Sequence, residues 1–350
     1  MTDKLRGNFY PTAVGSLPYK DAKTACEKIL KYFKDIPFWP QLIRRSFLEN
    51  MYVQYSQGMP GIVVDSENKR IYVDTGKELS AEIERLYDRF LRDDVEYFSI
   101  GKEYAQGFYA FLEVLKESSV RPKFLKGQIT GPVSFGLTVT DDKKRSLFHN
   151  AELKEALVKA LSMKARWQAR KLKETGIECI ISIDEPYLTS IGSSFISLKK
   201  EDVFSALGEI VAAVHKEGAL AAMHCCGNTD WGFLLTTGID ILSFDAYNFY
   251  ESVTLYPKEI NDFLKRGGLL AWGIIPNTQD ILKENYNTLV ERLEKALDLF
   301  IKKGIEKADL LNAMLITPSC GLGLVDEYLS DIVLENTAGF SRKMRELNGK

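Results

Sequence analysis

Short apolar runs alternate with longer amphipathic stretches along most of this chain. The runs end in small or polar residues, which is typical of strands buried on both faces of a parallel sheet. Residues 153–172 carry apolar side chains at helical spacing, and Gly176 follows them as a stop signal. The eight runs are residues 12–16, 37–42, 124–132, 178–186, 219–226, 239–247, 268–276 and 312–320.

Helical patterns lie between the runs, so the chain is typical of repeated βα units. Further helices are predicted at residues 20–33 and at residues 279–303, the second with Thr278 as its N-cap. Eight such units predict an α/β fold of the (β/α)8 TIM barrel type. An open, doubly wound sheet is the alternative, but no glycine-rich phosphate loop follows an early run.

Residues 43–122 exceed what a plain barrel needs. Within them, GIVVD and RIYVD flank the polar turn SENK and predict a β-hairpin among helical segments. We therefore expect an α+β-hairpin insertion near the N-terminus, on the rim of the barrel. Because no linker, repeat or low-complexity tract divides the chain, residues 1–350 are predicted to form a single TIM-barrel domain.

The bulk composition argues against several kinds of partner. Hydrophobic residues make up 45% of the chain and charged residues 27%, which is ordinary for a globular protein. The net charge of -2 provides no basic surface for nucleic acid. No apolar segment is long enough to cross a bilayer, and the N-terminal residues lack the apolar core of a signal peptide. We expect a cytoplasmic protein with no nucleic-acid or membrane partner.

Five cysteines in 350 residues do not resemble a disulfide framework. Cys26 on a helix face and Cys179 inside a strand are expected to be buried packing residues. Cys225 and Cys226 are adjacent, and a disulfide between adjacent cysteines requires backbone strain. The stretch MHCC that contains them leaves two interpretations open: a metal site, or two buried thiols beside a histidine.

A metal site is favoured by the spacing of His224 and Cys226. They are separated by one residue, so on a strand they point to the same side while Cys225 points away. Cys320 ends the last run, and the carboxyl ends of barrel strands converge on one face. Two thiolates and an imidazole favour Zn²⁺, and three ligands leave a position for substrate. Asp245, at the end of another run, is a candidate fourth ligand.

Polar residues also end the remaining runs. Asp184 and Glu185 are candidate catalytic acid–base groups or binders of a substrate amine. Both also suit a purely structural role, capping the turn that Pro186 stiffens, and the sequence does not decide between the two. Ser16 and Gln128, together with Asp184, are the candidate substrate-binding residues.

Several of these stretches resemble one superfamily, which joins cobalamin-independent methionine synthase, the zinc methyltransferases acting on coenzyme M, and uroporphyrinogen decarboxylase. HCC and the later CGL resemble the His-X-Cys and Asp-Cys-Gly-Leu motifs of methionine synthase. The resemblance covers residues 12–18 and 124–322 and leaves out the predicted insertion. Three further stretches resemble the synthase motifs Gly-Ser-Phe-Pro, Thr-Gly-Pro and Ile-Asp-Glu-Pro: VGSLP (14–18), ITGPVSFG (129–136) and SIDEP (182–186).

The resemblance implies a zinc-dependent S-methyltransferase in which His224, Cys226 and Cys320 bind Zn²⁺. Zinc would then hold an acceptor thiol, such as homocysteine or coenzyme M, as the nucleophilic thiolate. Ser16 and Asp184 would hold the amino acid part of homocysteine. The full-length synthase has a second barrel that helps to bind folate, and this chain carries only one. That difference favours a methyl-corrinoid protein over methyl-folate as the donor.

Two other functions stay open. A metal-independent decarboxylase or lyase of the uroporphyrinogen decarboxylase type would use Asp184 as its acid–base group, although the arginine-rich N-terminal motif of that family is absent. A non-catalytic protein that binds a corrinoid carrier would bind that partner without transferring a methyl group. Chelators would leave the activity of a decarboxylase or lyase unchanged. Rapid methyl transfer to a thiol would exclude the non-catalytic binding protein.

Overall fold

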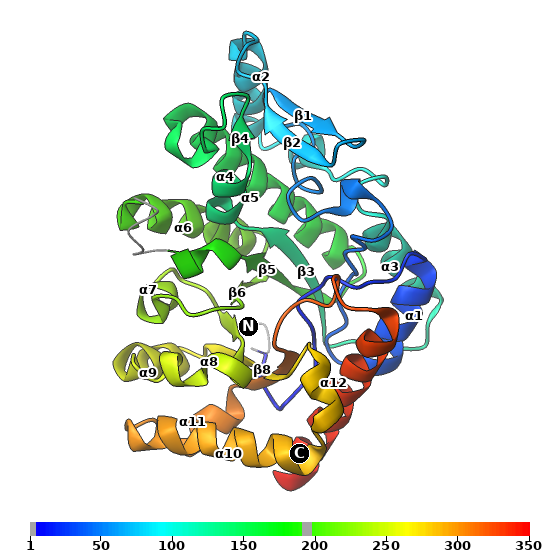
Figure 1. The fold of residues 1–350 in the computed structure, drawn as a ribbon, viewed down its shortest axis with the longest axis vertical. Coiled ribbons are helices and arrows are strands. Elements are labelled where there is room, and N and C mark those ends of the chain that lie inside the picture. Colours follow the sequence, from blue (N-terminus) through cyan, green and yellow to red (C-terminus); the bar gives the residue numbers. More distant parts are fainter. Residues whose placement is uncertain (1–4, 191–197) are drawn as a thin grey trace.

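The centre of the protein is a curled, parallel six-stranded sheet, seen in a computed structural model that describes residues 5–190 and 198–350. Helices cover its outer side (Figure 1). The buried, nearly continuous apolar strands suit a sheet that is covered on both faces. In spatial order the strands are β3 (Phe124–Thr130), β5 (Glu178–Asp184), β6 (Leu220–Cys225), β7 (Ile241–Phe244), β8 (Leu269–Ile275) and β9 (Met314–Pro318).

The helices lie mostly between these strands in the sequence, as expected for βα units. No helix within the described ranges is both long enough and apolar enough to cross a membrane. The α-helices are α1 (Ala22–Tyr32), α2 (Ser80–Leu91), α3 (Gln106–Glu117), α4 (Pro132–Thr138), α5 (Ala151–Lys173), α6 (Lys200–Lys216), α7 (Trp231–Leu235), α8 (Ala246–Val253), α9 (Pro257–Lys265), α10 (Tyr286–Lys302), α11 (Lys307–Asn312) and α12 (Glu327–Leu347).

The two faces of the sheet differ in chemistry. Outward residues such as Met223 join the large apolar core beneath the helices. Inward residues such as Ala222 and Ile241 form a second apolar cluster. Two residues further along the same strands, the inner face turns polar at His224 and Ser243. The inner face is therefore apolar deep in the sheet and polar toward the carboxyl ends of the strands, where a site can form.

The first two predicted strands are the main departure from the expected barrel. Residues 12–16 and 37–42 run beside the sheet without forming regular strands. Pro37 and Pro40 have no N–H to donate, so a continuous ladder cannot run through the second segment. The regular ladder is therefore open between β9 and β3, and the eight-stranded barrel is only partly realised. Isolated bridges join Pro11 to Ile316, Ser16 to Gln41 and Phe38 to Lys126.

The predicted β-hairpin is confirmed. Strands β1 (Ile62–Asp65) and β2 (Arg70–Val73) pair antiparallel across the polar turn. A short strand that was not predicted, β4 (Thr140–Asp141), adds to β2 in parallel and completes a three-stranded sheet. In Figure 1 this sheet and α2 lie at the upper end, far from α10. That residues 43–122 are an insertion into a single barrel domain stays a prediction.

The long helix expected at residues 279–303 is interrupted. A 3₁₀ helix, η5 (Gln279–Lys283), precedes α10, and Thr278 caps this short element instead of the long one. Asn285 caps α10 in a reciprocal capping box with Thr288. The sequence prediction missed the break because a second N-cap signal lies inside the periodic apolar stretch. The helix expected at residues 20–33 is confirmed as α1.

Candidate metal centre

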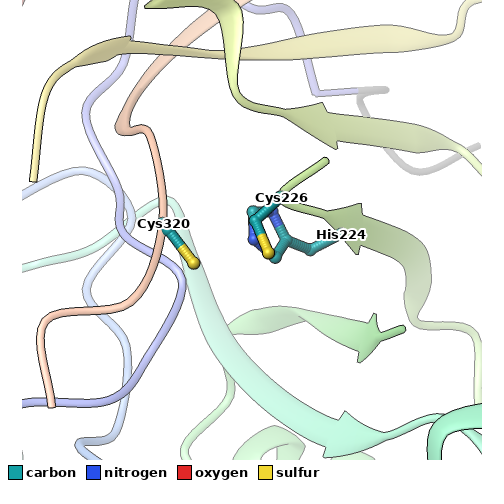
Figure 2. A group of neighbouring side chains, drawn as sticks. All are labelled: His224, Cys226 and Cys320. Carbon is teal, nitrogen blue, oxygen red and sulfur yellow. The ribbon is translucent and has the colours of Figure 1, made fainter. Parts of the chain in front are cut away.

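Three predicted ligands meet at the carboxyl ends of the strands. His224 belongs to β6, Cys226 is the first residue after it, and Cys320 is the second residue of the loop that follows β9. Their ligand atoms all lie within 4.8 Å of one another. Figure 2 shows the Cys320 side chain reaching from its loop toward Cys226 and His224. Residues far apart in the sequence thus form one His/Cys/Cys cluster.

The remaining cysteines take no part in this cluster. Cys225 is fully buried in the apolar core on the opposite side of β6 from His224. Cys26 and Cys179 are equally buried, each with its thiol against a backbone carbonyl. Strand alternation therefore predicted correctly which cysteine of the adjacent pair faces the site and which one packs.

His224 carries a free ring nitrogen. Its Nδ1 lies 3.0 Å from Ser243 Oγ, and its buried Nε2 has no hydrogen-bond partner among the described residues. When Nδ1–H donates to the serine, Nε2 carries the lone pair that binds metals. An unpaired buried polar atom costs about 1–3 kcal/mol. A metal ion bound to Nε2 would remove that cost.

The two thiols of the cluster influence each other's protonation. The Cys320 thiol and the His224 ring stabilise a thiolate at Cys226 and so lower the Cys226 pKa. The hydrogen bond with Cys226, burial and the charge of Cys226 raise the pKa of Cys320. A thiolate at Cys226 therefore disfavours a second thiolate at Cys320. A positive ion between the two sulfurs would favour the thiolate form of both, as in thiolate metal sites.

This donor set fits Zn²⁺. One imidazole nitrogen and two sulfurs are ligands that zinc prefers, and three protein ligands leave one tetrahedral position for an exogenous group. The free Nε2 of His224 lies in the same cluster as the two sulfurs. The ligands also come from two separate chain segments, so the sheet and the loop after β9 together set the size of the site.

Asp245 lies close to this cluster but outside it. It is the N-cap of α8, and its carboxylate accepts hydrogen bonds from Asn248 N at 2.9 Å and Asn248 Nδ2 at 2.7 Å. Burial raises its pKa, and the charges of His224 and Cys226 also act on it. Both carboxylate oxygens are thus engaged with α8, and a role as fourth ligand stays a prediction.

Asp184 is placed beside the centre. It ends β5 and is paired with His224 in the register of β5 and β6. Ser182 Oγ donates to its carboxylate at 2.9 Å. Burial raises its pKa, while the positive charge of Lys126 opposes that shift. Both the catalytic and the substrate-binding prediction for Asp184 remain untested by this geometry.

Glu185 makes structural contacts. Its buried carboxylate accepts hydrogen bonds from Val133 N, from Ser134 N and from Ser134 Oγ, at 2.9, 2.8 and 2.6 Å. Burial raises its pKa to about 7, against the effect of these donors. The side chain therefore caps the first turn of α4. Its predicted catalytic role stays a prediction beside this observed one.

Ser16 and Gln128 both contact residues 37–42, which lie where the regular sheet is open. Ser16 Oγ accepts a hydrogen bond from Gly323 N at 3.2 Å, in the loop that carries Cys320. Gln128 Nε2 donates to Trp39 O at 3.2 Å, while its buried Oε1 has no partner among the described residues. An unpaired acceptor inside the sheet is suited to a donor group on a substrate, which keeps Gln128 a candidate binder.

Several residues support the site for which the sequence had predicted no specific role. Ser243 holds the ring of His224. Asn277 Nδ2 donates to Gly321 O at 3.1 Å and its Oδ1 accepts from Ser319 Oγ at 2.9 Å, so it steadies the loop of Cys320. Lys126 lies buried within the sheet. The available signal was a polar or charged residue at an inward position of an otherwise apolar strand, as at Lys126 in FLKGQIT.

Comparison with known proteins supports the fold. No family model matches the chain, and no curated protein matches it in sequence. Among solved structures, the chain is similar to one described as the "Putative Vitamin-B12 Independent Methionine Synthase" from Listeria monocytogenes. The TM-score is 0.59 with 13% sequence identity, over 96% of this chain and 97% of that one. The two chains thus share an architecture over nearly their full lengths.

Proposed function

We propose that this protein is a zinc-dependent S-methyltransferase with a small-molecule thiol, such as homocysteine or coenzyme M, as acceptor. The observation that carries the proposal is the cluster of His224, Cys226 and Cys320, with its free Nε2 and its two coupled thiols. The similarity to a structure described as a methionine synthase agrees with the proposal at the level of fold.

The residues of the chain have distinct parts in this reaction. Zinc, when bound, supplies a Lewis acid that keeps an acceptor thiol deprotonated at neutral pH. His224, Cys226 and Cys320 would hold that ion, because their ligand atoms lie within 4.8 Å of one another. Asp184 and Gln128 present oxygen acceptors that would orient an amino group of the substrate. His224 and Gln128 are buried, and little water around them strengthens each electrostatic contact.

The methyl donor in this proposal is a methyl-corrinoid on a partner protein, with methyl-folate as the alternative. Two exposed apolar residues lie near Cys320 in the sequence: Leu324, in the same loop, is 86% exposed, and Tyr328, at the start of α12, is 72% exposed. Exposed apolar side chains are suited to contact with a large donor. An assay of methyl transfer distinguishes the two donors when methylcobalamin or methyl-folate is supplied with homocysteine or coenzyme M.

The first experiment is metal analysis of the purified protein, followed by methyl transfer from methylcobalamin to each thiol. We expect about one zinc per chain and formation of a thioether. In Cys320→Ser, both the zinc content and the rate should fall by at least about tenfold, because one of three ligands is lost. A protein that binds no zinc when zinc is added would contradict the proposal.

A metal-independent decarboxylase or lyase is the second candidate function. It is favoured by Asp184, whose burial raises the pKa of the carboxyl group, as a general acid near neutral pH requires. Its activity would be unchanged by chelators and by Cys320→Ser, and would be abolished in Asp184→Asn. The same two variants therefore separate the two functions.

A further inference from the structure

Lys126 is a charged residue inside the sheet that the proposed reaction does not use. It lies on β3 and is 6% exposed. Its Nζ donates to Val14 O at 2.6 Å, and its backbone pairs with Pro37 and Trp39. The side chain thus passes across residues 37–42 and reaches the preceding extended segment.

Burial of this ammonium group is costly. It lowers the pKa of Lys126 to about 8, and the negative charge of Asp184 only partly opposes that effect. No ion pair with Lys126 occurs within the described ranges. A methionine side chain of similar length would avoid the desolvation cost. What the ammonium group adds is its hydrogen bond to Val14 O.

The segment held by Lys126 leaves little freedom to the residues that follow Val14. Gly15 has a φ of 145°, and a side chain there would lie 2.7 Å from the Gln128 amide carbon. Gly15 O accepts from Gln41 N at 3.0 Å, and Leu17 N donates back to Gln41 O at 2.9 Å. Ser16 is therefore fixed from both sides.

Ser16 in turn holds the loop of Cys320. Its carbonyl accepts from Leu322 N at 2.9 Å, and its Oγ accepts from Gly323 N at 3.2 Å. A side chain at Gly321 would come to within 2.3 Å of Ser16 Oγ, so the two segments are in close contact. A continuous series of contacts thus leads from Lys126 through Val14 and Ser16 to the loop that carries Cys320.

We infer that Lys126 is a positioning residue that sets the place of the Cys320 thiolate in the metal centre, an inference that rests on the proposed zinc site. Among the described residues, Lys126 makes no hydrogen bond or ion pair with the three candidate ligands, and it acts through the backbone of residues 14–16. Without its hydrogen bond, Val14 O loses its buried partner and the loop after β9 loses its fixed support. His224 stays in place because it belongs to β6, and Cys226 directly follows that strand, so neither depends on residues 14–16.

The test compares Lys126→Met with Lys164→Met. Lys164 lies on α5 in the helical layer and is also buried. Among the described residues, its ammonium group donates a single hydrogen bond, to Phe98 O at 3.5 Å. Zinc affinity is measured by competition with a chromophoric chelator, and the thiolate-to-cobalt absorption is recorded after loading with Co²⁺. We expect Lys126→Met to weaken zinc binding by about 10–100-fold and to lose the absorption contributed by Cys320. Lys164→Met should retain wild-type values for both.

The outcomes separate this inference from the proposed function. If the wild type binds neither metal, the zinc site itself is wrong. If it binds both metals and Lys126→Met matches it, the positioning role is overturned. Tighter zinc binding in Lys126→Met would also overturn the positioning role. The removal of a positive charge by itself favours the binding of a cation, so that result would show only this electrostatic effect. If Lys126→Met does not fold, Ser16→Ala decides, since it removes a later contact in the series and must weaken zinc binding in the same way.

Discussion

At the scale of the residue, the direction of each side chain along β6 decides its chemistry. Cys225 and Cys226 are neighbours in sequence, yet one is fully buried in the apolar core and the other lies beside His224. Burial raises the pKa of Cys225 to about 12 and keeps it a neutral thiol. Hydrogen bonds with Cys320 and His224 instead lower the pKa of Cys226. The same functional group is therefore inert at one position and a candidate metal ligand at the next.

We predict that Cys226→Ala loses the bound zinc and that Cys225→Ala retains it. Removal of Cys226 takes away one of three ligands, whereas removal of Cys225 leaves only a small cavity in the core. That cavity should lower the free energy of unfolding by roughly 1 kcal/mol. Zinc content by mass spectrometry and denaturant unfolding measure the two effects. Equal zinc loss in both variants would mean that Cys225 also binds the metal.

At the scale of the element, Glu185 shows how a motif residue can serve the fold. It follows β5 and ties that strand to the start of α4 through three hydrogen bonds. A side chain at Gly131 would lie 2.1 Å from its Oε1, so only glycine leaves room for this approach. The Asp-Glu-Pro segment thus combines a residue beside the site with a helix cap.

Glu185→Ala should lower the free energy of unfolding by about 2–4 kcal/mol, because three buried donors lose their acceptor. Glu185→Gln, which keeps one carboxamide oxygen, should lose less. Both variants should keep the wild-type zinc affinity. Denaturant unfolding and metal competition measure these effects. If Glu185→Ala keeps wild-type stability and loses only turnover, the catalytic prediction for Glu185 is correct instead.

A second element-level contact depends on pH. His215 at the end of α6 lies 2.7 Å from Asp240, which also accepts from Ala221 N in β6 at 2.8 Å. The hydrogen bond to Asp240 raises the pKa of His215. A raised histidine pKa stabilises the fold fully below the ordinary value of about 6.5, and this stabilisation disappears as the pH rises through the folded-state pKa.

We therefore predict that His215→Gln destabilises the protein at about pH 6 more than at about pH 8.5. The urea midpoint of each protein at the two pH values measures this difference. His149→Gln is the matched control, since His149 is exposed in the 3₁₀ helix η3 (Leu147–His149). A stability difference that stays constant with pH would show that the pair is not charged in the folded protein.

At the scale of the whole molecule, the candidate metal centre connects distant parts of the sheet. His224 lies on β6, a strand near the middle of the sheet, and Cys226 follows that strand directly, while Cys320 lies in the loop after the edge strand β9. The regular ladder is open beyond β9, where only isolated bridges continue it. A bound ion would therefore hold an edge that backbone hydrogen bonds hold only sparsely.

Zinc removal should lower the thermal midpoint of unfolding. An ion that binds only the folded state stabilises it by about 4 kcal/mol at a thousandfold excess over its Kd. Thermal scans of the zinc-loaded protein with and without chelator measure the shift, and Cys226→Ser, which lacks a ligand, should not respond to the chelator. A wild-type midpoint that is unchanged by the chelator would argue against metal bound between β6 and the β9 loop.

Periodicity was sufficient for the six regular strands and for the helices α1 and α5, because each buries its own side chains in a characteristic repeat. It failed at residues 12–16 and 37–42, where apolar composition indicated strands but prolines prevented a continuous ladder. It also failed at η5, where a second cap divided one apolar stripe. Both failures arose where local hydrogen-bonding capacity overrode the hydrophobic pattern.

The sequence alone determined the βα alternation, the hairpin, and the common orientation of His224 and Cys226, because these depend on local geometry within one strand or helix. The tertiary structure decided that Cys320 joins them, that Glu185 caps α4, and that Lys126 reaches Val14. These contacts join residues far apart in the chain. Their distances depend on how the whole sheet curls, which no local pattern encodes.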